Sequence, residues 1–389
     1  MIEYPLPEDL DTRGRDYVRD TLGRSFHGIE VRCEDGRIYV DESNDDTCTV
    51  ERVAEIVAAA RGLRARVHYR SVHRSRSEDD PLPDLVASDD VIPIGEGGYV
   101  FQGRFWQVFQ GLQRYVRAIA RDAGAVEQES PPLWPIDLLR RIDYLHEFPH
   151  QVVLATGVKE DFASRQAIAD DYAKGREYRT VDVSTHFEPS RRGLQPAVCD
   201  ACYYALRGRR DVGDRVLTTY GKVFRNETSS VGSLDRLPVF TVRDIMAVGS
   251  KAFVTEQIET LTVALRGFLD HFGFEATIED ADDPFFAGDA VLKARFQAAA
   301  GLKQELRARI PHLGTSIAIG SINRHLDHFG RAFEIDAPSG DRVHSGCIGI
   351  GFERATFALF SQYGGVVEAW PEPLRERLGI PASREEMPG

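Results

Sequence analysis

The sequence predicts an α+β fold built around an antiparallel sheet. From about residue 131 onward, helical segments and short strand-like runs, such as 216–223 and 239–242, follow one another irregularly. They lack the regular strand–helix–strand alternation that a parallel sheet requires. Of the 389 residues, 42% are hydrophobic and 28% are charged, which is an ordinary globular composition. This composition excludes a chain that is disordered over most of its length.

The first 95 residues predict a small α/β unit. Gly28 to Val40 alternates apolar and polar residues around Asp35-Gly36, which is the signal of a hairpin. Thr49 to Gly62 carries apolar residues at helical spacing, with Thr49 as the expected N-cap. A strand is expected over residues 64–72, and a polar loop that contains two prolines follows over 74–84.

Residues 96–389 are predicted to form the second and larger domain. It begins in the glycine-rich turn Gly95-Glu96-Gly97-Gly98, which we interpret as a loop because no strand–helix crossover surrounds it. A helix is predicted over Phe105–Asp122, because it would place Val108, Leu112 and their helical neighbours on one face.

Charge and cysteine content limit the classes of partner. The chain has 48 basic and 61 acidic residues, and its net charge of −13 argues against a large nucleic-acid footprint. No apolar stretch approaches the roughly 18–20 residues that cross a bilayer, and the first residues lack the pattern of a signal peptide. Five cysteines fit reduced thiols rather than a disulfide framework. We therefore expect a cytoplasmic protein that does not insert in a membrane.

A first chemical motif lies in Lys222 to Glu227. Arg225 and Glu227 are two residues apart, so in a strand they point to the same face. There the guanidinium can hold a phosphate oxygen while the carboxylate holds an amino group. A second strand is predicted from Val239 to Asp244, and Phe240 on it can present its ring to a planar base. The alternative is a surface ion pair across a hairpin.

A second motif lies in Cys347 to Phe360. A strand with Gly349 and Gly351 runs directly into a helix that has Arg354 in its first turn. The glycines let a ligand approach the backbone, and a helix N-terminus with an arginine suits a phosphate. A Rossmann fingerprint is excluded because the third glycine is missing.

Together these segments resemble class II aminoacyl-tRNA synthetases. Phe224 to Glu227 is similar to motif 2 of that superfamily, which would extend over about 222–244. Gly349 to Arg354 is similar to motif 3, which would extend over about 347–360. Residues 131–149, taken as a helix followed by a strand that enters Phe148-Pro149, are compatible with motif 1. The resemblance implies the class II fold, an antiparallel sheet flanked by helices.

The cysteines narrow the resemblance. Cys199, Asp244 and Cys347 are arranged as in the atypical zinc-dependent seryl-tRNA synthetases of methanogens, and more closely as in their truncated relatives, the amino acid:[carrier protein] ligases. In that family a Cys, a Glu and a second Cys hold zinc in the amino-acid pocket. Ser321 to Gly330 resembles the family's Ser-x-Asn-x-His stretch, which implies that Asn323 and His325 line this pocket; a core role for both stays open. The resemblance covers residues 95–364.

Asp244 departs from the family, whose middle ligand is Glu. Two thiolates and a carboxylate leave one position open for a substrate amine, as is typical of a functional zinc. Aspartate is about 1.5 Å shorter than glutamate, so either the pocket is reshaped around the zinc or the zinc has been lost. Alternatively, Cys199 and Cys347 are small buried hydrophobes, or Cys199 and Cys202 belong to a structural site, which no second Cys-x-x-Cys completes.

The resemblance implies an enzyme that attacks the α-phosphate of ATP with an amino-acid carboxylate. The products would be aminoacyl-adenylate and pyrophosphate, and the acyl group would then pass to an acceptor. Arg225 would contact the α-phosphate and the carboxylate, and Glu227 the adenine amino group. Phe240 and Arg354 would sandwich the adenine, with Arg354 also near the γ-phosphate. Mg²⁺ would accompany the triphosphate.

The expected acceptor is the phosphopantetheine thiol of a small acidic carrier protein. Residues 1–95 lack the heptads of a helical RNA-binding arm, so tRNA is not the expected acceptor. A basic patch at Arg207, Arg209 and Arg210 is a candidate docking site. The resemblance implies glycine, alanine or another small amino acid as substrate, and a homodimer. The alternatives are a seryl-type tRNA synthetase and a degenerate synthetase-like protein that binds or regulates without catalysis.

Overall fold

The computed structural model describes most of the chain. The described residues are 2–8, 10, 12–25, 30–34, 36–41, 48–60, 66–95, 97–173, 183–226, 234–283, 285, 293, 297 and 300–380.

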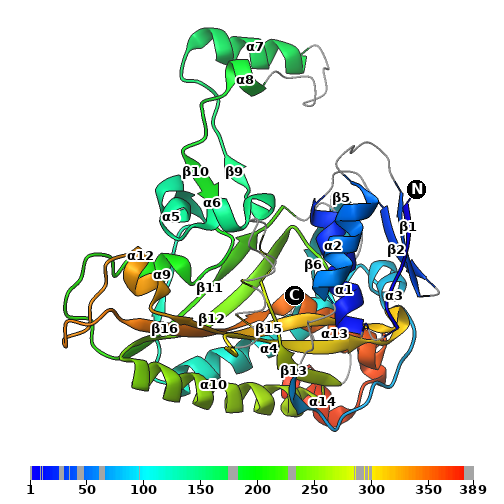
Figure 1. Cartoon of the computed structure of the whole chain (residues 1–389). Helices are drawn as coiled ribbons and strands as arrows, with labels where there is room; N and C mark the ends of the chain where they lie inside the picture. The colour runs from blue at the N-terminus through cyan, green and yellow to red at the C-terminus, as the bar shows by residue number, and fades with distance from the viewer. Residues whose placement is uncertain are drawn as a thin grey trace.

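An eight-stranded sheet forms the centre of the molecule (Figure 1). Its strand order is β4-β13-β14-β15-β16-β12-β11-β7, and every neighbouring pair is antiparallel except β11 and β7. The predicted α+β fold with an antiparallel sheet is therefore confirmed. The strands are β4 (Val67–Arg70), β7 (Val126–Gln128), β11 (Arg215–Phe224), β12 (Val239–Gly249), β13 (Ala276–Asp280), β14 (Lys303–Ile310), β15 (Thr315–Leu326) and β16 (His344–Gly351).

Four helices cover one face of this sheet. They are α4 (Gly103–Asp122), α10 (Lys251–Phe272), α13 (Phe352–Tyr363) and α14 (Glu372–Leu378). Helices α10 and α14 are seen below the sheet in Figure 1. The predicted helix over Phe105–Asp122 is confirmed. Helix α10 begins where the Ser250 hydroxyl accepts a hydrogen bond from the Phe253 amide at 3.3 Å, and it ends at Gly273, whose φ is +70°.

Strand alternation separates this core from the opposite face. Buried aliphatic side chains from five neighbouring strands pack with aromatic side chains of α10 and α13 in the main core; the strand residues are Ile245, Ile278, Leu306, Ile322 and Ile348. The residue before or after each of them points the other way. The opposite face therefore carries the polar and glycine positions of the same strands.

A second core lies on that opposite face, toward one end of the sheet. Trp134, Leu138, Tyr203 and Phe329 pack there against Met246 of β12. The core joins a small sheet to four helices, and an arm of two further helices extends beyond it (Figure 1). The sheet strands are β8 (Leu133–Pro135), β9 (Leu154–Ala155) and β10 (Arg192–Leu194); the helices are α5 (Ile136–Arg141), α6 (Tyr144–Glu147), α9 (Asp200–Tyr204) and α12 (His328–Ala332); the arm holds α7 (Phe162–Ala173) and α8 (Val183–His186).

The prediction of a strand that enters Phe148-Pro149 is wrong. Helix α6 runs up to Glu147, and a 3-10 helix, η1 (Pro149–Gln151), follows directly. Proline is favoured in the first turn of a helix because its fixed φ suits it and its missing amide has no partner to lose there. A helix followed by a strand occurs instead at α4 and β7, so we propose that the motif 1 segment lies there.

The N-terminal unit has its own small core of Val18, Leu22, Ile38, Val40 and Val53. It comprises β1 (Ile2–Pro5), α1 (Thr12–Ser25), β2 (Glu30–Glu34), β3 (Arg37–Asp41) and α2 (Val50–Ala60). The predicted hairpin and the helix after Thr49 are present, and the Arg52 amide donates to Thr49 Oγ1 at 3.3 Å. Helix α1 was not predicted.

The segment between this unit and α4 joins the main body. Strand β4 pairs with β13, and buried Leu85 and Val91 belong to the main core. Residues 66–101 also hold α3 (Leu82–Ala87) and the hairpin of β5 (Val91–Gly95) and β6 (Gly98–Phe101). The domain boundary expected at residue 95 stays a proposal. The division of the hydrophobic cores favours a break between residues 60 and 67.

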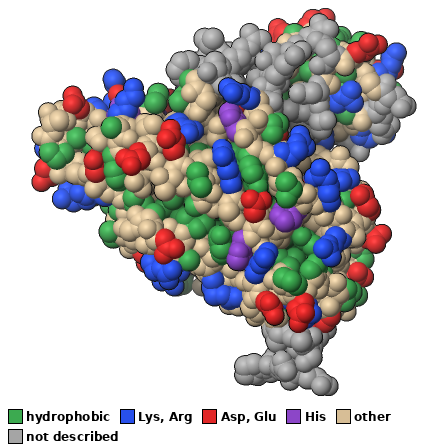
Figure 2. Space-filling model, turned by 90° about the horizontal axis from the view of Figure 1, so that it is seen from below, with side chains coloured by type: hydrophobic (Ala, Val, Ile, Leu, Met, Phe, Trp, Pro, Cys, Tyr) green, Lys and Arg blue, Asp and Glu red, His purple; other side chains and the backbone are tan. Residues whose placement is uncertain are grey.

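The surface carries charges of both signs. Figure 2 shows basic and acidic side chains spread over the face seen from below, with hydrophobic side chains between them, so this face carries no field of one sign. Among the described residues, no helix is long and apolar enough to cross a membrane.

A buried carboxylate ties the three central segments together. Glu353 in α13 accepts hydrogen bonds from the Thr241 amide and hydroxyl, both at 2.7 Å, and from Lys222 Nζ at 2.9 Å. Its exposed fraction is 1%. Strands β11 and β12 are thereby fixed to the helix that begins at the end of β16.

We predict that Glu353→Ala lowers the free energy of unfolding by about 2–4 kcal/mol, because it leaves buried donors without an acceptor. The measurement is urea unfolding followed by circular dichroism. The matched control is Glu256→Ala on the exposed face of α10. An equal loss in both variants would contradict the structural role given to Glu353.

Candidate active site

A large cavity of about 1580 Å³ lies on the sheet face opposite the four helices. Its floor includes a row of directly opposed residues from five strands: Asp244, Gly349, Ser321, Glu305 and Glu279. The row places an acid at each end and small side chains in the middle. A ligand can therefore lie flat across the centre of the sheet and reach charged groups at both ends.

Gly349 is required by its neighbour in this row. A Cβ atom at Gly349 would lie 2.4 Å from Asp244 Oδ1, which is closer than any real carbon–oxygen contact. The bare backbone of β16 thus gives the Asp244 carboxylate its space. Position 349 in the motif 3 segment must therefore be glycine for a structural reason that the sequence did not reveal.

Cys199, Asp244 and Cys347 come together at one end of the cavity. Their ligand atoms all lie within 4.8 Å of one another, and all three residues are buried. Cys199 directly precedes helix α9, while Asp244 and Cys347 lie on the paired strands β12 and β16. The Cys199–Asp244–Cys347 cluster joins residues separated by 148 positions, from 199 to 347.

The electrostatics of this cluster favour a bound cation. The pKa of Cys347 is held well below its usual range by its hydrogen bond with Cys199, with His325 adding to the effect. The pKa of Cys199 is raised well above its usual range by the same hydrogen bond and by burial. Burial also raises the pKa of Asp244 well above its usual range. Three buried acids thus lie close together at one end of the cavity, where they cannot all be ionised without a compensating cation.

The donor set fits zinc. Two thiols and one carboxylate, with ligand atoms within 4.8 Å of one another, are three of the donors that a four-coordinate zinc takes. A divalent cation would stabilise all three ionised forms, since a metal can deprotonate its thiol ligands. The shorter aspartate side chain still brings a carboxylate oxygen within 4.8 Å of both sulfurs. We therefore propose these three residues as metal ligands.

Asn323 and His325 lie beside Cys347. Asn323 Nδ2 donates to Cys347 Sγ at 3.5 Å and to Ser321 Oγ at 3.0 Å. His325 Nε2 is 3.7 Å from Cys347 Sγ, and its Nδ1 is 3.2 Å from Ser345 Oγ. Both residues also line the cavity. They can orient the sulfur as well as line a substrate pocket, because groups that hydrogen-bond a ligand atom fix its direction.

Asp200 is a member of this site that the sequence analysis missed. It is buried, lines the cavity and accepts a hydrogen bond from the Cys199 thiol at 3.5 Å. Burial raises its pKa to about 7. No sequence signal distinguished it, because a lone acid after a cysteine has no characteristic spacing.

Arg225, Phe240 and Arg354 come together beside the cluster. The guanidinium carbons of Arg225 and Arg354 lie 5.4 Å and 5.8 Å from the centre of the Phe240 ring. Arg225 Nε donates to the Pro196 carbonyl at 3.1 Å. A base stacked on both sides needs about 7 Å between Phe240 and Arg354. Arg354 would therefore move outward by about 1 Å to admit one.

Two details of the sequence prediction differ from the structure. Arg225 lies just beyond the end of β11 at Phe224, so it is not a strand residue. Gln195 and Pro196 approach the chain here: the Phe224 amide donates to the Gln195 carbonyl at 2.9 Å, while the Arg225 amide donates to the Pro238 carbonyl at 2.9 Å. Glu227 lies outside the described residues. Strand β16, helix α13 and the position of Arg354 in its first turn are as predicted.

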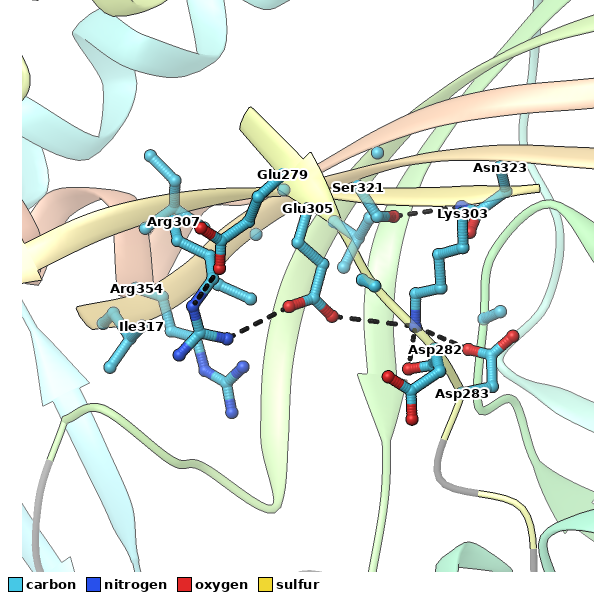
Figure 3. A pocket seen from close by; sticks show the side chains of 18 of the residues that line it. Glu279, Asp282, Asp283, Lys303, Glu305, Arg307, Ile317, Ser321, Asn323 and Arg354 are labelled. Carbon is cyan, nitrogen blue, oxygen red and sulfur yellow. Dashed lines mark hydrogen bonds and ion pairs between the residues drawn. The ribbon is translucent and has the colours of Figure 1, made fainter. Parts of the chain in front are cut away.

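A chain of ion pairs lies at the far end of the floor, the end that Glu305 and Glu279 form, away from Asp244 (Figure 3). Arg307 contacts Glu305 at 3.1 Å and Glu279 at 3.5 Å. Lys303 contacts Glu305 at 3.6 Å and Asp283 at 2.6 Å. The sequence shows charges at every second position from Lys303 to Arg307, a strand pattern that the analysis did not use. The two cations offset part of the charge of the three acids at this end.

The three arginines proposed as a docking patch are exposed, and they follow helix α9. Arg207 lies over the Tyr204 ring at 4.4 Å, and Arg210 pairs with Asp336. Part of the positive charge is therefore offset within the protein.

Comparisons with known proteins agree with the motifs. No protein-family model matches the chain. It is 28% identical over 303 residues to an amino acid–[acyl-carrier-protein] ligase of Bradyrhizobium diazoefficiens, which covers 77% of this chain and 90% of the relative. It is 24% identical over 398 residues to a type-2 serine–tRNA ligase of Methanothermobacter thermautotrophicus, covering 97% of this chain and 74% of that one. The resemblance to these two groups is confirmed.

Solved structures support the fold. The M. kandleri SerRS, in its complex with A. aeolicus tRNASec, matches with a TM-score of 0.71 and 22% identity, over 92% of this chain and 75% of that one. The cytoplasmic serine-tRNA ligase of Naegleria fowleri, in complex with AMP, matches with a TM-score of 0.62 and 13% identity, over 85% and 70%. The chain has the class II synthetase fold.

We predict about one zinc per chain in protein purified without chelator, and its loss in Cys347→Ser, because two remaining donors bind zinc weakly. The measurement is elemental analysis by mass spectrometry. Cys202→Ser is the matched control: Cys202 is equally buried but is not part of the cluster. Zinc retained by Cys347→Ser, or lost from Cys202→Ser, would contradict the assignment.

Proposed function

We propose that this protein activates a small amino acid with ATP and transfers the aminoacyl group to the phosphopantetheine thiol of a carrier protein. One observation carries the proposal. The Arg225–Phe240–Arg354 group and the Cys199–Asp244–Cys347 cluster lie beside one cavity on one sheet face. The two groups can hold a nucleotide and an amino acid side by side.

The nucleotide end binds the adenosine and orients the phosphates. Phe240 and Arg354 hold the two faces of the adenine, one by stacking and the other by cation–π contact. Arg225 neutralises the α-phosphate and the incoming carboxylate, which would otherwise repel each other. Glu227 follows two residues later and is proposed to accept from the adenine amino group. Mg²⁺ accompanies the triphosphate.

The other end binds the amino acid. Cys199, Asp244 and Cys347 hold the zinc, which, when bound, supplies an open position for the substrate's α-amine. Asn323 and His325 keep the Cys347 sulfur in place and form part of the pocket wall. With its amine held here, the substrate directs its carboxylate toward Arg225.

In the first step the main contribution of the protein is to position the amino-acid carboxylate and the α-phosphate of ATP. A carboxylate oxygen attacks the α-phosphorus, the bond to the bridging oxygen breaks, and pyrophosphate leaves. Holding both reactants in line removes most of the entropy cost of their encounter. The arginines compensate the charge that develops on the phosphoryl oxygens. In the second step the carrier thiol attacks the acyl carbon, and AMP leaves.

The first experiment measures amino-acid-dependent exchange of pyrophosphate into ATP. We predict exchange with one or a few amino acids, and a loss of at least about a hundredfold in kcat/KM for Arg354→Ala, because the variant loses both a base contact and a phosphate contact. Arg121→Ala, an exposed arginine at the end of α4, is the matched control. Equal rates for wild type and Arg354→Ala would contradict the role of Arg354.

A second experiment identifies the acceptor. We predict a thioester on a phosphopantetheinylated carrier protein, detected by intact mass, and no ester on tRNA. Charge reversal of Arg207 and Arg209 should raise KM for the carrier several-fold without changing pyrophosphate exchange, since this patch contacts only the acceptor. Aminoacylation of tRNA instead of the carrier would overturn the proposed acceptor and favour a seryl-type synthetase.

A further inference from the structure

Arg307 is a cation of the cavity floor that has no task in the proposed activation. It lies on β14 and lines the cavity, where its side chain is 22% exposed. Three contacts hold its guanidinium: Nε donates to Ser316 Oγ at 3.1 Å, Nη2 to the Ser316 carbonyl at 2.6 Å, and Nη1 to Glu305 at 3.1 Å. A guanidinium that is already held in one position loses little side-chain entropy when it binds an anion.

Strand register places Arg307 near the nucleotide end of the cavity. Arg307 opposes Ala318 on β15. The carbonyl of the next residue, Ile319, lies 3.9 Å from the position that a Cβ atom at Gly351 would take, and the Phe240 ring lies 4.0 Å from the same position. Alanine and glycine positions therefore separate Arg307 from Phe240, and they leave room above the floor for the phosphates of a nucleotide.

The direction of the proposed reaction gives this position a meaning. The amino-acid carboxylate approaches the α-phosphorus from the Cys199–Asp244–Cys347 cluster, and in such a displacement the leaving oxygen lies roughly in line with the attacking one. Pyrophosphate must therefore leave on the side away from the cluster. Strand β14 is on that side, two strands away from β16 and three from β12. Figure 3 shows Arg307 and Arg354 pointing into the same part of the cavity.

The charges around Arg307 suit the leaving group as well. Magnesium pyrophosphate carries negative phosphoryl oxygens and a divalent cation. Arg307 can face the oxygens, while Glu305 and Glu279, which lie 3.1 Å and 3.5 Å from its guanidinium, can face the cation. Because Mg²⁺ offsets the repulsion between carboxylates and phosphates, this mixture of charges fits the magnesium complex better than free pyrophosphate.

We propose that Arg307, together with Arg354, binds the β- and γ-phosphates of ATP and then the leaving pyrophosphate. The proposal rests on the proposed function and adds a residue to it. When the bond between the α-phosphorus and the bridging oxygen breaks, its electron pair stays on that oxygen, which becomes part of pyrophosphate. A fixed guanidinium beside the pyrophosphate stabilises this charge as it develops.

The test compares two nucleotides that differ only in these phosphates. Isothermal titration calorimetry gives the Kd of ATP and the Kd of AMP, both with excess Mg²⁺. For Arg307→Ala we expect the Kd of ATP to rise by roughly tenfold to a hundredfold, the usual worth of charge-assisted hydrogen bonds, and the Kd of AMP to stay unchanged. Arg307→Lys keeps the charge without the planar fork, so its Kd for ATP should lie between the two.

The ratio of the two constants separates binding from structure. Damage to the fold that weakens both nucleotides equally leaves the ratio of the Kd of ATP to that of AMP unchanged. Arg117→Ala is the matched control: it also removes one positive charge and an ion pair, with Glu127 at 2.8 Å, but it lies on α4, on the opposite face of the sheet. Both constants should stay as in wild type in this variant.

Two results would overturn the inference and leave the proposed function intact. One is a ratio of the Kd values that is the same in Arg307→Ala and in wild type, since it would exclude contact with the outer phosphates. The other is an equal change of the ratio in Arg117→Ala, since it would show an effect of net charge alone. Binding of neither nucleotide to the folded wild-type protein would overturn the proposed function itself.

Discussion

The site depends on one close approach, that of the Asp244 carboxylate to the bare backbone of Gly349. Strand pairing makes these residues direct neighbours, and any Cβ at 349 would collide with the carboxylate. Because the carboxylate occupies that space, it can lie within reach of Cys347 on the same strand as Gly349 and of Cys199 at the start of α9. One strand pair thus supplies two of the three proposed metal ligands, Asp244 and Cys347, part of the cavity floor and the strand that leads into Arg354.

The rest of the molecule keeps this strand pair in place. On the helix side, Ile245 and Ile348 are buried against α10 and α13, and Glu353 fixes α13 to β11 and β12. On the cavity side the same strands present their polar residues. Alternate residues of each strand therefore serve different roles: one set packs in the hydrophobic core and the other set lines the cavity. At the far end of the floor, ion pairs with Lys303 and Arg307 offset part of the negative charge of the acids on β13 and β14. The floor of the cavity therefore has small residues in its middle and acidic residues at both ends.

Much of this arrangement could be predicted from the sequence, and the exceptions have physical causes. Short strand-like runs identified β11 and β12, and Gly-x-Gly before a helix identified the junction of β16 and α13, since both signals are local. The partners of Cys199 and Cys347 needed a resemblance, because only tertiary structure joins positions so far apart. The strand at Phe148-Pro149 failed because proline can open a 3-10 turn as readily as it can end a strand. Asp200 was missed because a lone acid after a cysteine has no characteristic spacing, and its burial beside the cavity becomes visible only in the fold.

The most direct test of this account is a crystal structure of the zinc-loaded protein with glycyl-sulfamoyl adenosine, a stable analogue of an aminoacyl-adenylate. The account predicts the adenine between Phe240 and Arg354, the sulfamoyl group beside Arg225, and the glycyl amine at the cluster of Cys199, Asp244 and Cys347. An analogue bound elsewhere in the cavity, or one whose amine points away from that cluster, would contradict it.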